Sequence, residues 1–338
     1  MQEMSQAMDL HRRNLPRRHN PGLRTKMSIQ AMAEEISNQT RDLPRFASWL
    51  RETRVPKFNP SSLIFAGSGD SYAAAVFAEE LSHGKSLASD PYELLTNIGR
   101  ARGKNLAIVS ISGRTRTNIK LAKKAKNVAV KRIAVTANPE SPLARECDDT
   151  LQLRYRAPGI LTSGTISFTT SLLACGALLR NVPSTVRLES ALSAAKVWAR
   201  ELKLTKEGSL VFVGSGVDFA LALYGAAKIH EVLGTRAEAV YPEQLGHAKL
   251  FTIDKKRDHV VCISSGRDKA KDTHQLLIKH GFRSSIMAFP DSHVVNRSLK
   301  IAIYLQRLAV SLARKKGIKE CAFLSDKSRL NLSNRMIY

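Results

Sequence analysis

Phe65-Ala-Gly-Ser-Gly-Asp-Ser71 is the stretch that decides the fold, because Phe212-Val-Gly-Ser-Gly-Val-Asp218 repeats its pattern 147 residues later. Two more pairs follow in the same order, at separations of 153 and 151 residues: Ile111-Ser-Gly-Arg114 with Ser264-Ser-Gly-Arg267, and Ala137-Asn-Pro-Glu-Ser141 with Ala288-Phe-Pro-Asp-Ser292. Three matches in one order and at a nearly constant separation indicate an internal repeat. The sequence therefore predicts a duplicated domain.

Short apolar runs alternate with segments of helical period in both copies. The runs expected to form strands are 63–66, 106–110 and 133–136 in the first copy and 210–213, 259–263 and 285–288 in the second. The segments expected to form helices include 71–81, 115–125, 219–233 and 270–280. Continuous apolar strands separated by helices are typical of parallel sheets covered on both faces. We therefore expect an α/β fold with two doubly wound parallel sheets flanked by helices.

The remaining segments complete the predicted domain organisation. Residues 1–27 are basic and rich in Pro and Asn, which predicts a disordered arm, and residues 28–56 carry apolar residues at helical spacing, which predicts a helical lead-in. The two α/β domains are expected to span 57–183 and 184–325. A helical stretch over 163–204, interrupted at Pro183, is expected to connect them, and residues 326–338 show no period and are expected to form a tail.

Composition is that of an ordinary globular protein. Of the 338 residues, 43% are hydrophobic and 24% charged, and no run approaches the roughly 18 consecutive apolar residues that a membrane-spanning helix needs. The basic N-terminal stretch has no apolar segment behind it, so we expect no secretory signal. The cysteines lie too far apart to indicate a disulfide framework or a zinc site. We therefore expect a cytoplasmic protein that uses no membrane, metal or organic cofactor.

The charge balance is strongly basic, with 53 Lys and Arg residues against 29 Asp and Glu residues and a net charge of +24. No single tail carries this excess, because residues 1–26 contribute +4 and residues 311–338 contribute +5. A basic surface attracts polyanions and steers anionic ligands inward. RNA-binding surfaces also need stacking aromatics, yet aromatics make up only 6% of this chain. A phosphorylated small molecule is therefore a better candidate partner than a specific nucleic acid.

Two turns are the candidate ligand site, because doubly wound sheets bind ligands beyond the carboxyl ends of their strands. Ala66-Gly-Ser-Gly-Asp-Ser71 opens a predicted helix, whose N-terminus favours an anion. Ser110-Ile-Ser-Gly-Arg-Thr115 places three hydroxyls around a glycine at another predicted helix start, which suits a phosphate monoester. The alternative is that the hydroxyls only cap the helix, although a cap needs one hydroxyl rather than three. Arg114 could pair with a phosphate or another acidic group, or lie in solvent.

These motifs resemble those of a known family. Gly-Ser-Gly-x-Ser-Tyr at 67–72, Ser-x-Ser-Gly-x-Thr at 110–115 and Val-Thr-Ala-Asn-Pro-Glu-Ser-Pro-Leu-Ala at 135–144 are similar to motifs of the sugar isomerase (SIS) domain. Two copies followed by a basic tail look most like the isomerase half of glucosamine-6-phosphate synthase and its stand-alone relatives, and Met32-Ala-Glu-Glu-Ile-Ser-Asn-Gln39 resembles the motif that precedes that domain in the family. The resemblance covers about residues 30–338 and implies two SIS domains of flavodoxin-like topology.

The resemblance also implies which residues form the site. Those that would bind the sugar phosphate are Ser71, Ser110, Ser112 and Thr115, with Asp70 and Arg114 at positions where the family often has other residues. Gly225-Ala-Ala-Lys-Ile-His-Glu231 is similar to a helix that places Lys228 and Glu231 at the active site. Tyr241-Pro-Glu-Gln-Leu-Gly-His247 is similar to a segment whose His opens the sugar ring. In the family this His typically comes from the neighbouring subunit, so His247 would make the protein a homodimer with shared active sites.

Aldose–ketose isomerisation needs a group that opens the ring and a carboxylate that moves a proton between adjacent carbons. Glu231 and His247 would supply these two groups. Taken alone, Lys228 and Glu231 are three residues apart on a helix and could form only a surface ion pair. Their place between the second glycine turn and His247 favours the catalytic interpretation.

Two departures from the synthases narrow the predicted activity. The chain begins Met-Gln and has too few residues ahead of its first strand for a glutaminase domain, so glutamine is not expected to supply nitrogen. The imine-forming Lys of the synthases falls on Asn334 or Arg335, although Lys327 and Arg329 are kept. We therefore expect an aldose–ketose isomerase or a deaminase acting on a hexose-6-phosphate or aminohexose-6-phosphate. The alternatives are a non-catalytic sugar-phosphate-sensing regulator and a basic nucleic-acid-associated protein.

Overall fold

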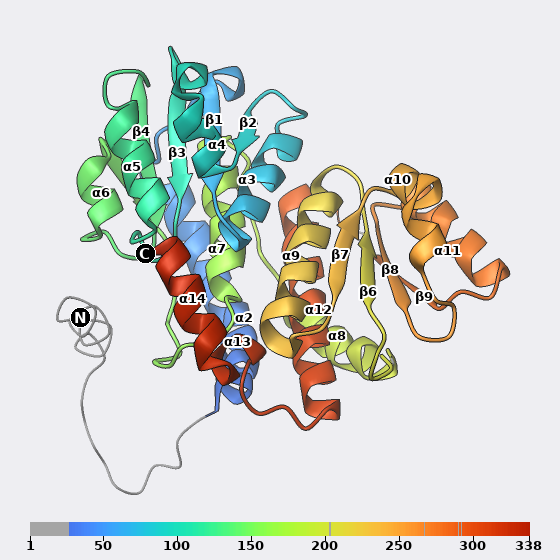
Figure 1. Ribbon diagram of the computed structural model, residues 1–338. Helices are drawn as coiled ribbons and strands as arrows, with labels where there is room; N and C mark the ends of the chain where they lie inside the picture. The colour runs from blue at the N-terminus through green and yellow to red at the C-terminus, as the bar shows by residue number, and fades with distance from the viewer. Residues whose placement is uncertain (1–26, 203, 267, 290, 292) are drawn as a thin grey trace, which may run out of the picture.

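The computed structural model describes residues 27–202, 204–266, 268–289, 291 and 293–338, so the predicted basic arm lies outside the described residues apart from Met27. Two parallel β-sheets, each flanked by helices, organise the chain (Figure 1). We call the parts built on them the first and the second unit. This arrangement confirms the predicted α/β class.

The first sheet has the strand order β2-β1-β3-β4-β5, and all of its pairs are parallel. Its strands are β1 (Leu63–Gly67), β2 (Leu87–Ser89), β3 (Asn105–Val109), β4 (Lys131–Thr136) and β5 (Asp149–Gln152). All residues of β1 and β3 are buried, which explains why these strands are continuous apolar runs. The order reverses between β1 and β3, and such a switch point is where ligands bind in doubly wound sheets.

The second sheet has the order β7-β6-β8-β9, again with parallel pairs only. Its strands are β6 (Leu210–Val213), β7 (Ala237–Val240), β8 (His259–Ser264) and β9 (Ser284–Ala288). This is the order of the first four strands of the first sheet, which supports the predicted duplication. Within the described part of the chain, no counterpart of β5 follows β9.

Helices cover both sheets. Those from the first part of the chain are α2 (Ser28–Glu52), α3 (Asp70–Leu81), α4 (Pro91–Thr96), α5 (Arg116–Ala125), α6 (Pro142–Glu146) and α7 (Ile166–Leu178). Those that follow are α8 (Glu189–Glu201), α9 (Val217–Leu233), α10 (Pro242–His247), α11 (Lys269–Lys279), α12 (Val294–Lys315), α13 (Ala322–Ser325) and α14 (Lys327–Ile337). Short 3-10 helices are η1 (Pro60–Ser62), η2 (Ile98–Ala101) and η3 (Lys249–Thr252).

One apolar core lies between the two sheets and is shared by both units. It includes Phe65 and Phe212 from the central strands, and it continues through α2, α3 and α7 of the first unit and α9 and α12 of the second (Figure 1). The rings of Phe168 on α7 and Tyr224 on α9 stack with their centroids 3.7 Å apart. Smaller clusters cover the outer faces of the two sheets. Because the units share a core, α9 is fixed beside the first sheet's helices.

The predicted strands and helices lie within two residues of the observed ones at each end, but two expectations about connecting segments need correction. The helical stretch over 163–204 is two helices separated by residues 179–188, a wider break than Pro183 alone. The predicted tail is wrong, because residues 327–337 form α14, whose N-terminus is capped by Asp326. This helix buries none of its residues, so its sequence lacks the apolar period that a packed helix shows.

The described residues form neither a helix suited to span a membrane nor a cluster of metal-binding side chains. None of the helices within the described ranges is both long and apolar enough to cross a bilayer. Among the same residues, His, Cys, Asp and Glu side chains form no group of three or more that could hold a metal ion.

Candidate active site

The turn after β1 brings Asp70 and Ser71 to the carboxyl edge of the first sheet. Gly69 has a φ of 60°, a conformation that glycine adopts at little cost, and α3 begins at the next residue. A side chain at Gly67 would clash with Ser71, so the turn is tight. Ser71 is buried in the first turn of α3. The helix N-terminus therefore faces the edge of the sheet where the strand order reverses.

The turn after β3 carries the three hydroxyls that the sequence singled out. Gly113 has a φ of 62°, and a Cβ there would collide with Ser141, so glycine is required. The Ser112 hydroxyl accepts a hydrogen bond from the Arg114 backbone N–H at 3.3 Å. Thr115 precedes α5 without capping it, which argues against the simple capping interpretation for this hydroxyl.

Two hydroxyls of this turn are open to a ligand. Ser110 Oγ and Thr115 Oγ1 have no hydrogen-bond partner among the described residues. The strand pairing places Gly67 beside Val109, so the turns after β1 and β3 are neighbours at the switch point. Hydroxyls and backbone N–H groups at two adjacent helix N-termini form a site suited to a phosphate.

The equivalent turn of the second unit is filled by the chain's own carboxylate. Asp268 stands where the repeat predicts the counterpart of Thr115. Its Oδ2 accepts hydrogen bonds from the backbone N–H and the hydroxyl of Ser265 at 2.6 and 2.9 Å. Its Oδ1 accepts from the Ser264 hydroxyl at 2.9 Å and the Lys271 N–H at 3.0 Å. Burial acts to raise the pKa of Asp268, but these hydrogen bonds outweigh it and lower the pKa.

A second carboxylate, Asp218, follows the other glycine turn of the second unit and pairs with Arg297 of α12. Asp218 stands where the repeat places the counterpart of Ser71. Its two oxygens accept from the Arg297 guanidinium at 2.6 and 3.1 Å, and both side chains are buried. In the turn after β8, Asp268 therefore takes the donors whose counterparts after β3 stay open, so an anion is expected at the first unit.

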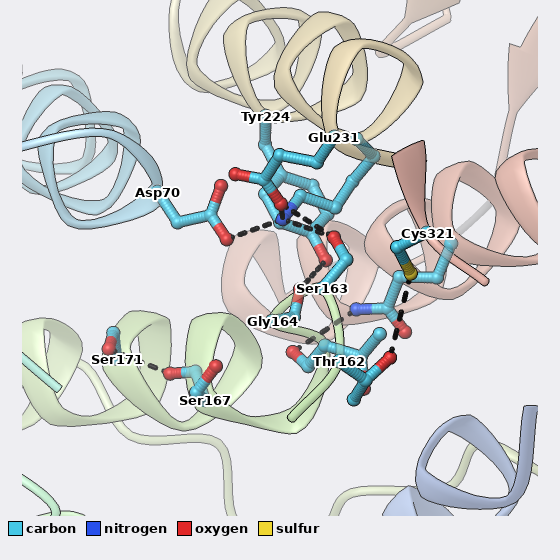
Figure 2. A network of polar contacts seen from close by, with 12 residues as sticks. Asp70, Thr162, Ser163, Gly164, Ser167, Ser171, Tyr224, Glu231 and Cys321 are labelled. Atoms are coloured by element: carbon cyan, nitrogen blue, oxygen red, sulfur yellow. Dashed lines mark hydrogen bonds and ion pairs between the residues drawn. The ribbon is translucent and has the colours of Figure 1, made fainter. Parts of the chain in front are cut away.

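The predicted residues Lys228 and Glu231 meet Asp70 in one buried polar cluster (Figure 2). The Lys228 ammonium is completely buried and donates to Asp70 Oδ2 at 2.7 Å, Glu231 Oε2 at 2.5 Å and Ser163 Oγ at 2.9 Å. Ser163 Oγ also donates to Glu231 Oε2 at 2.6 Å. The interaction of Lys228 and Glu231 is therefore no surface ion pair, because α9 packs against α3 and the segment before α7 covers it.

The pKa values of the two carboxylates in this cluster shift in opposite directions. Burial raises the pKa of Asp70 to about 7, against the opposing charge of Lys228. Burial also acts to raise the pKa of Glu231, but the charge and hydrogen bond of Lys228 and the bond from Ser163 lower it overall. Burial acts to lower the pKa of Lys228, and the two carboxylates outweigh it and raise the pKa. Lys228 and Glu231 are therefore both ionised at neutral pH.

Each of the two carboxylates in the cluster has one oxygen that accepts no hydrogen bond from the described residues. Glu231 Oε1 has no hydrogen-bond partner among the described residues, and the side chain is 37% exposed, so a ligand can reach it. Asp70 Oδ1 is buried without a donor. A buried carboxylate oxygen that lacks a donor is costly unless a ligand or water supplies one.

A second polar network supports the segment before α7 and was only partly visible in the sequence. Glu35, in the quoted motif on α2, accepts a hydrogen bond from Thr165 at 2.5 Å, and burial raises its pKa to about 7. Gln39 bonds to Thr169 and to Gln306 of α12. Tyr224 donates to the Gly164 carbonyl at 2.9 Å. Ser163 was not among the predicted site residues, and its only signal is a polar Thr-Ser-Gly-Thr run ahead of a helix that is buried along its whole length.

Arg114 and His247 stand apart from this cluster. The hydrogen bond described for Arg114 comes from its backbone, and the half-buried side chain has no partner among the described residues. His247 is exposed at the end of α10, and its ring lies 3.2 Å from the Glu243 carboxylate of the same helix. The structure thus joins Asp70, Lys228 and Glu231, and it leaves His247 exposed on α10.

Comparisons with known proteins agree with this fold. Residues 58–180 match the model of the SIS domain family. The isomerizing glutamine–fructose-6-phosphate aminotransferase of Sulfurisphaera tokodaii is 26% identical over 247 residues, which are 68% of this chain and 40% of that enzyme. The chain spans less than half the length of the curated relatives it matches. The match to the family model covers the first unit, so a second SIS domain stays a prediction.

Solved structures show the same fold over most of the chain. Glucosamine-6-phosphate deaminase from Thermotoga maritima superposes with a TM-score of 0.70 at 19% identity and covers 86% of this chain and 96% of its own. The C-terminal domain of glucosamine-fructose-6-phosphate aminotransferase from Francisella tularensis has a TM-score of 0.67 at 18% identity, with coverages of 90% and 100%. At these identities the likeness is one of fold, that of SIS-type proteins with two parallel sheets.

Proposed function

We propose that this protein binds a hexose-6-phosphate or aminohexose-6-phosphate at the first unit and acts on it as an aldose–ketose isomerase or a deaminase. One observation carries the proposal: the turn after β3 leaves the Ser110 and Thr115 hydroxyls open, whereas the Asp268 carboxylate fills the equivalent turn of the second unit. The names of the two solved proteins of this fold, an aminosugar-phosphate deaminase and an aminotransferase domain, support the class of substrate.

The proposed roles follow from the geometry of the cluster. Ser71, Ser110, Ser112 and Thr115 would hold the phosphate. Glu231 would take a proton from one carbon of the open-chain sugar and return it to the adjacent carbon, through an enediol, with no net change in protons. Lys228 holds Glu231 in place and ionised, and its charge would stabilise the negative charge that develops on the enediol oxygens. His247 of a second subunit would move the proton that opens the ring.

Deamination would use the same groups and one further reactant. Proton transfer turns an aminohexose-6-phosphate into an imine of the ketose, and water adds to that imine carbon. The carbon–nitrogen bond then breaks, and ammonia and the ketose phosphate leave.

The experiment is to incubate the purified protein separately with fructose-6-phosphate, glucose-6-phosphate and glucosamine-6-phosphate. NMR of the sugar carbons and an assay of released ammonia would follow the products. Interconversion of the first two shows an isomerase, and ammonia from the third shows a deaminase. The variant Ser112→Ala/Thr115→Ala is the control for contaminating enzymes, because it should lose the activity.

A second candidate is a sensor that binds a sugar phosphate without chemistry. The observation that favours it is His247, whose polar contact lies within its own helix α10 rather than at the Lys228 cluster. The same experiment separates the two. A protein that binds hexose-6-phosphates by calorimetry but converts none of them is a sensor.

A further inference from the structure

A groove lined by basic side chains lies between α8 and α12. Its volume is about 300 Å³, and its lining residues are Lys196, Ala199, Arg200, Arg307, Val310, Ser311, Arg314 and Lys315. Five of these eight side chains are cationic and none is acidic. The groove shares no residue with the candidate active site, and the proposed function gives it no role.

Arg307 and Arg314 are two cations of this groove that lie close together. Arg307 is half-buried, its Nε is buried without a partner, and one of its terminal nitrogens donates to the Ser37 hydroxyl at 2.9 Å. Burial and the neighbouring charge of Arg314 lower the pKa of Arg307, which shows that these cations repel each other. Lys315 donates to the carbonyls of Arg200 and Leu202 at the end of α8. A bound anion would relieve the repulsion between Arg307 and Arg314.

We propose that this groove binds a compact polyphosphate, either the phosphate chain of a nucleotide or an inorganic polyphosphate. Several adjacent negative charges match a cluster of cations better than a single phosphate does, and guanidinium groups bind phosphate oxygens in pairs. The volume lies at the lower end of small-molecule sites, which span about 300 to 1,000 Å³. Nucleic acid is a poorer match, because it needs roughly 1,000 Å² of surface or more and stacking aromatics, and no aromatic side chain lines the groove.

The test is calorimetric titration of the full chain with inorganic tripolyphosphate at physiological salt. Arg307→Gln/Arg314→Gln should weaken binding at least 10-fold. Lys196→Gln/Arg200→Gln changes two exposed side chains of α8, on the other wall of the groove, and should also weaken binding. Because these side chains are exposed, their loss tests the groove without the risk of misfolding that comes with changing the half-buried Arg307. The matched control is Lys271→Gln/Lys279→Gln on α11, which removes the same charge from another exposed surface and should stay within about twofold of the parent.

Further titrations identify the ligand and separate this site from the sugar-phosphate site. A nucleoside triphosphate that binds as tightly as tripolyphosphate, or more tightly, supports recognition of the phosphate chain. Unchanged binding of tripolyphosphate to the Ser112→Ala/Thr115→Ala variant shows that the groove is separate from the sugar-phosphate site. The proposal is overturned if tripolyphosphate does not bind at millimolar concentration, or if the α11 control weakens binding as much as the groove variants. A 20-nucleotide RNA that binds more tightly and does not respond to the groove variants would also overturn it, since diffuse surface charge would then explain the binding.

Discussion

The Lys228 ammonium on α9 lies 2.7 Å from a carboxylate oxygen of Asp70 on α3, and this contact joins the second unit to the candidate site of the first. The two residues are 158 positions apart in the sequence. Lys228 is fully buried, whereas Asp70 and Glu231 keep 17% and 37% of their side chains exposed. The cation therefore stabilises the fold, because it compensates two carboxylates that the shared core partly removes from water.

Removing this cation should cost more stability than removing one of its partners. Lys228→Met leaves Asp70 and Glu231 without their buried counter-charge, which should lower the free energy of unfolding by about 3 to 5 kcal/mol. Asp70→Asn leaves Lys228 bonded to Glu231 and Ser163 and should cost about 1.5 to 3 kcal/mol, the value of one charge-assisted hydrogen bond. Denaturant unfolding at pH 7 measures both. If Lys228→Met were no more harmful than Asp70→Asn, the cluster would not depend on the lysine.

The buried carboxyl of Glu35 should make stability depend on pH. Its pKa is about 7 in the folded chain against an ordinary value of 4.5, so the folded state binds more protons between these values. The free energy of unfolding therefore falls as the pH rises from about 4.5 to about 7 and then levels off. Glu35→Gln cannot titrate and should remove at most about 3 kcal/mol of this fall.

Unfolding of the parent and Glu35→Gln at pH 5 and pH 8 is the measurement. Glu52→Gln changes a solvent-exposed carboxylate at the far end of the same helix and should keep the parent's pH dependence. Equal slopes for the parent and Glu35→Gln would show that the Glu35 carboxyl does not titrate in this range.

Local patterns predicted the turns well because each turn is encoded by adjacent residues. Glycine at 69 and 113 is needed for positive φ, and the repeat makes the same pattern visible twice. The helical spacing of Lys228 and Glu231 likewise predicted that their side chains meet. The sequence also contains a difference between the two copies, because Asp268 in the second copy aligns with Thr115 in the first. Only the hydrogen bonds from Ser264 and Ser265 show that the Asp268 carboxylate fills the turn.

Contacts between distant segments could not be predicted in the same way. Ser163 joins Lys228 only because α7 and α9 pack together in the shared core, and no local pattern marks the serine for that place. The α14 helix was missed because it buries no face, so the periodicity that reveals packed helices does not occur in its sequence. Sequence reasoning thus finds elements that bury a surface and misses those that do not.

The two open turns should bind one sugar phosphate per chain. Calorimetry with a hexose-6-phosphate should give a stoichiometry of one, because the Asp268 carboxylate takes the donors of the equivalent turn of the second unit. Ser112→Ala and Thr115→Ala should each weaken binding by about 1.5 to 3 kcal/mol, the value of a hydrogen bond to a charged group. Ser265→Ala is the matched control in the second unit and should leave affinity unchanged. A stoichiometry of two, or an effect of Ser265→Ala equal to that of Ser112→Ala, would contradict the assignment.

Glu231 should carry the proton transfer. Glu231→Gln keeps the shape of the side chain and an oxygen for Lys228 and Ser163, but it removes the base. A positioned base typically contributes 10²- to 10⁴-fold, so the rate of isomerisation should fall by about that factor while sugar-phosphate binding persists. Rates come from NMR of the interconverting sugars, and binding comes from calorimetry. A variant within a few-fold of the parent would show that another group moves the proton.

The exposed position of His247 leads to a prediction about assembly. If His247 acts at the site of a neighbouring subunit, then Glu231→Gln and His247→Ala chains, each inactive alone, should form hybrid dimers in which one of the two sites has both intact groups. With equal amounts of the two chains and free exchange, half of the dimers are hybrids, so roughly a quarter of all sites should be active.

Exchange is verified first with differently tagged chains, and the activity of the mixture is then measured. If hybrids form and the mixture stays inactive, Glu231 and His247 are not combined across a subunit interface. Activity near a quarter of the parent's would place the two groups of one site on two chains.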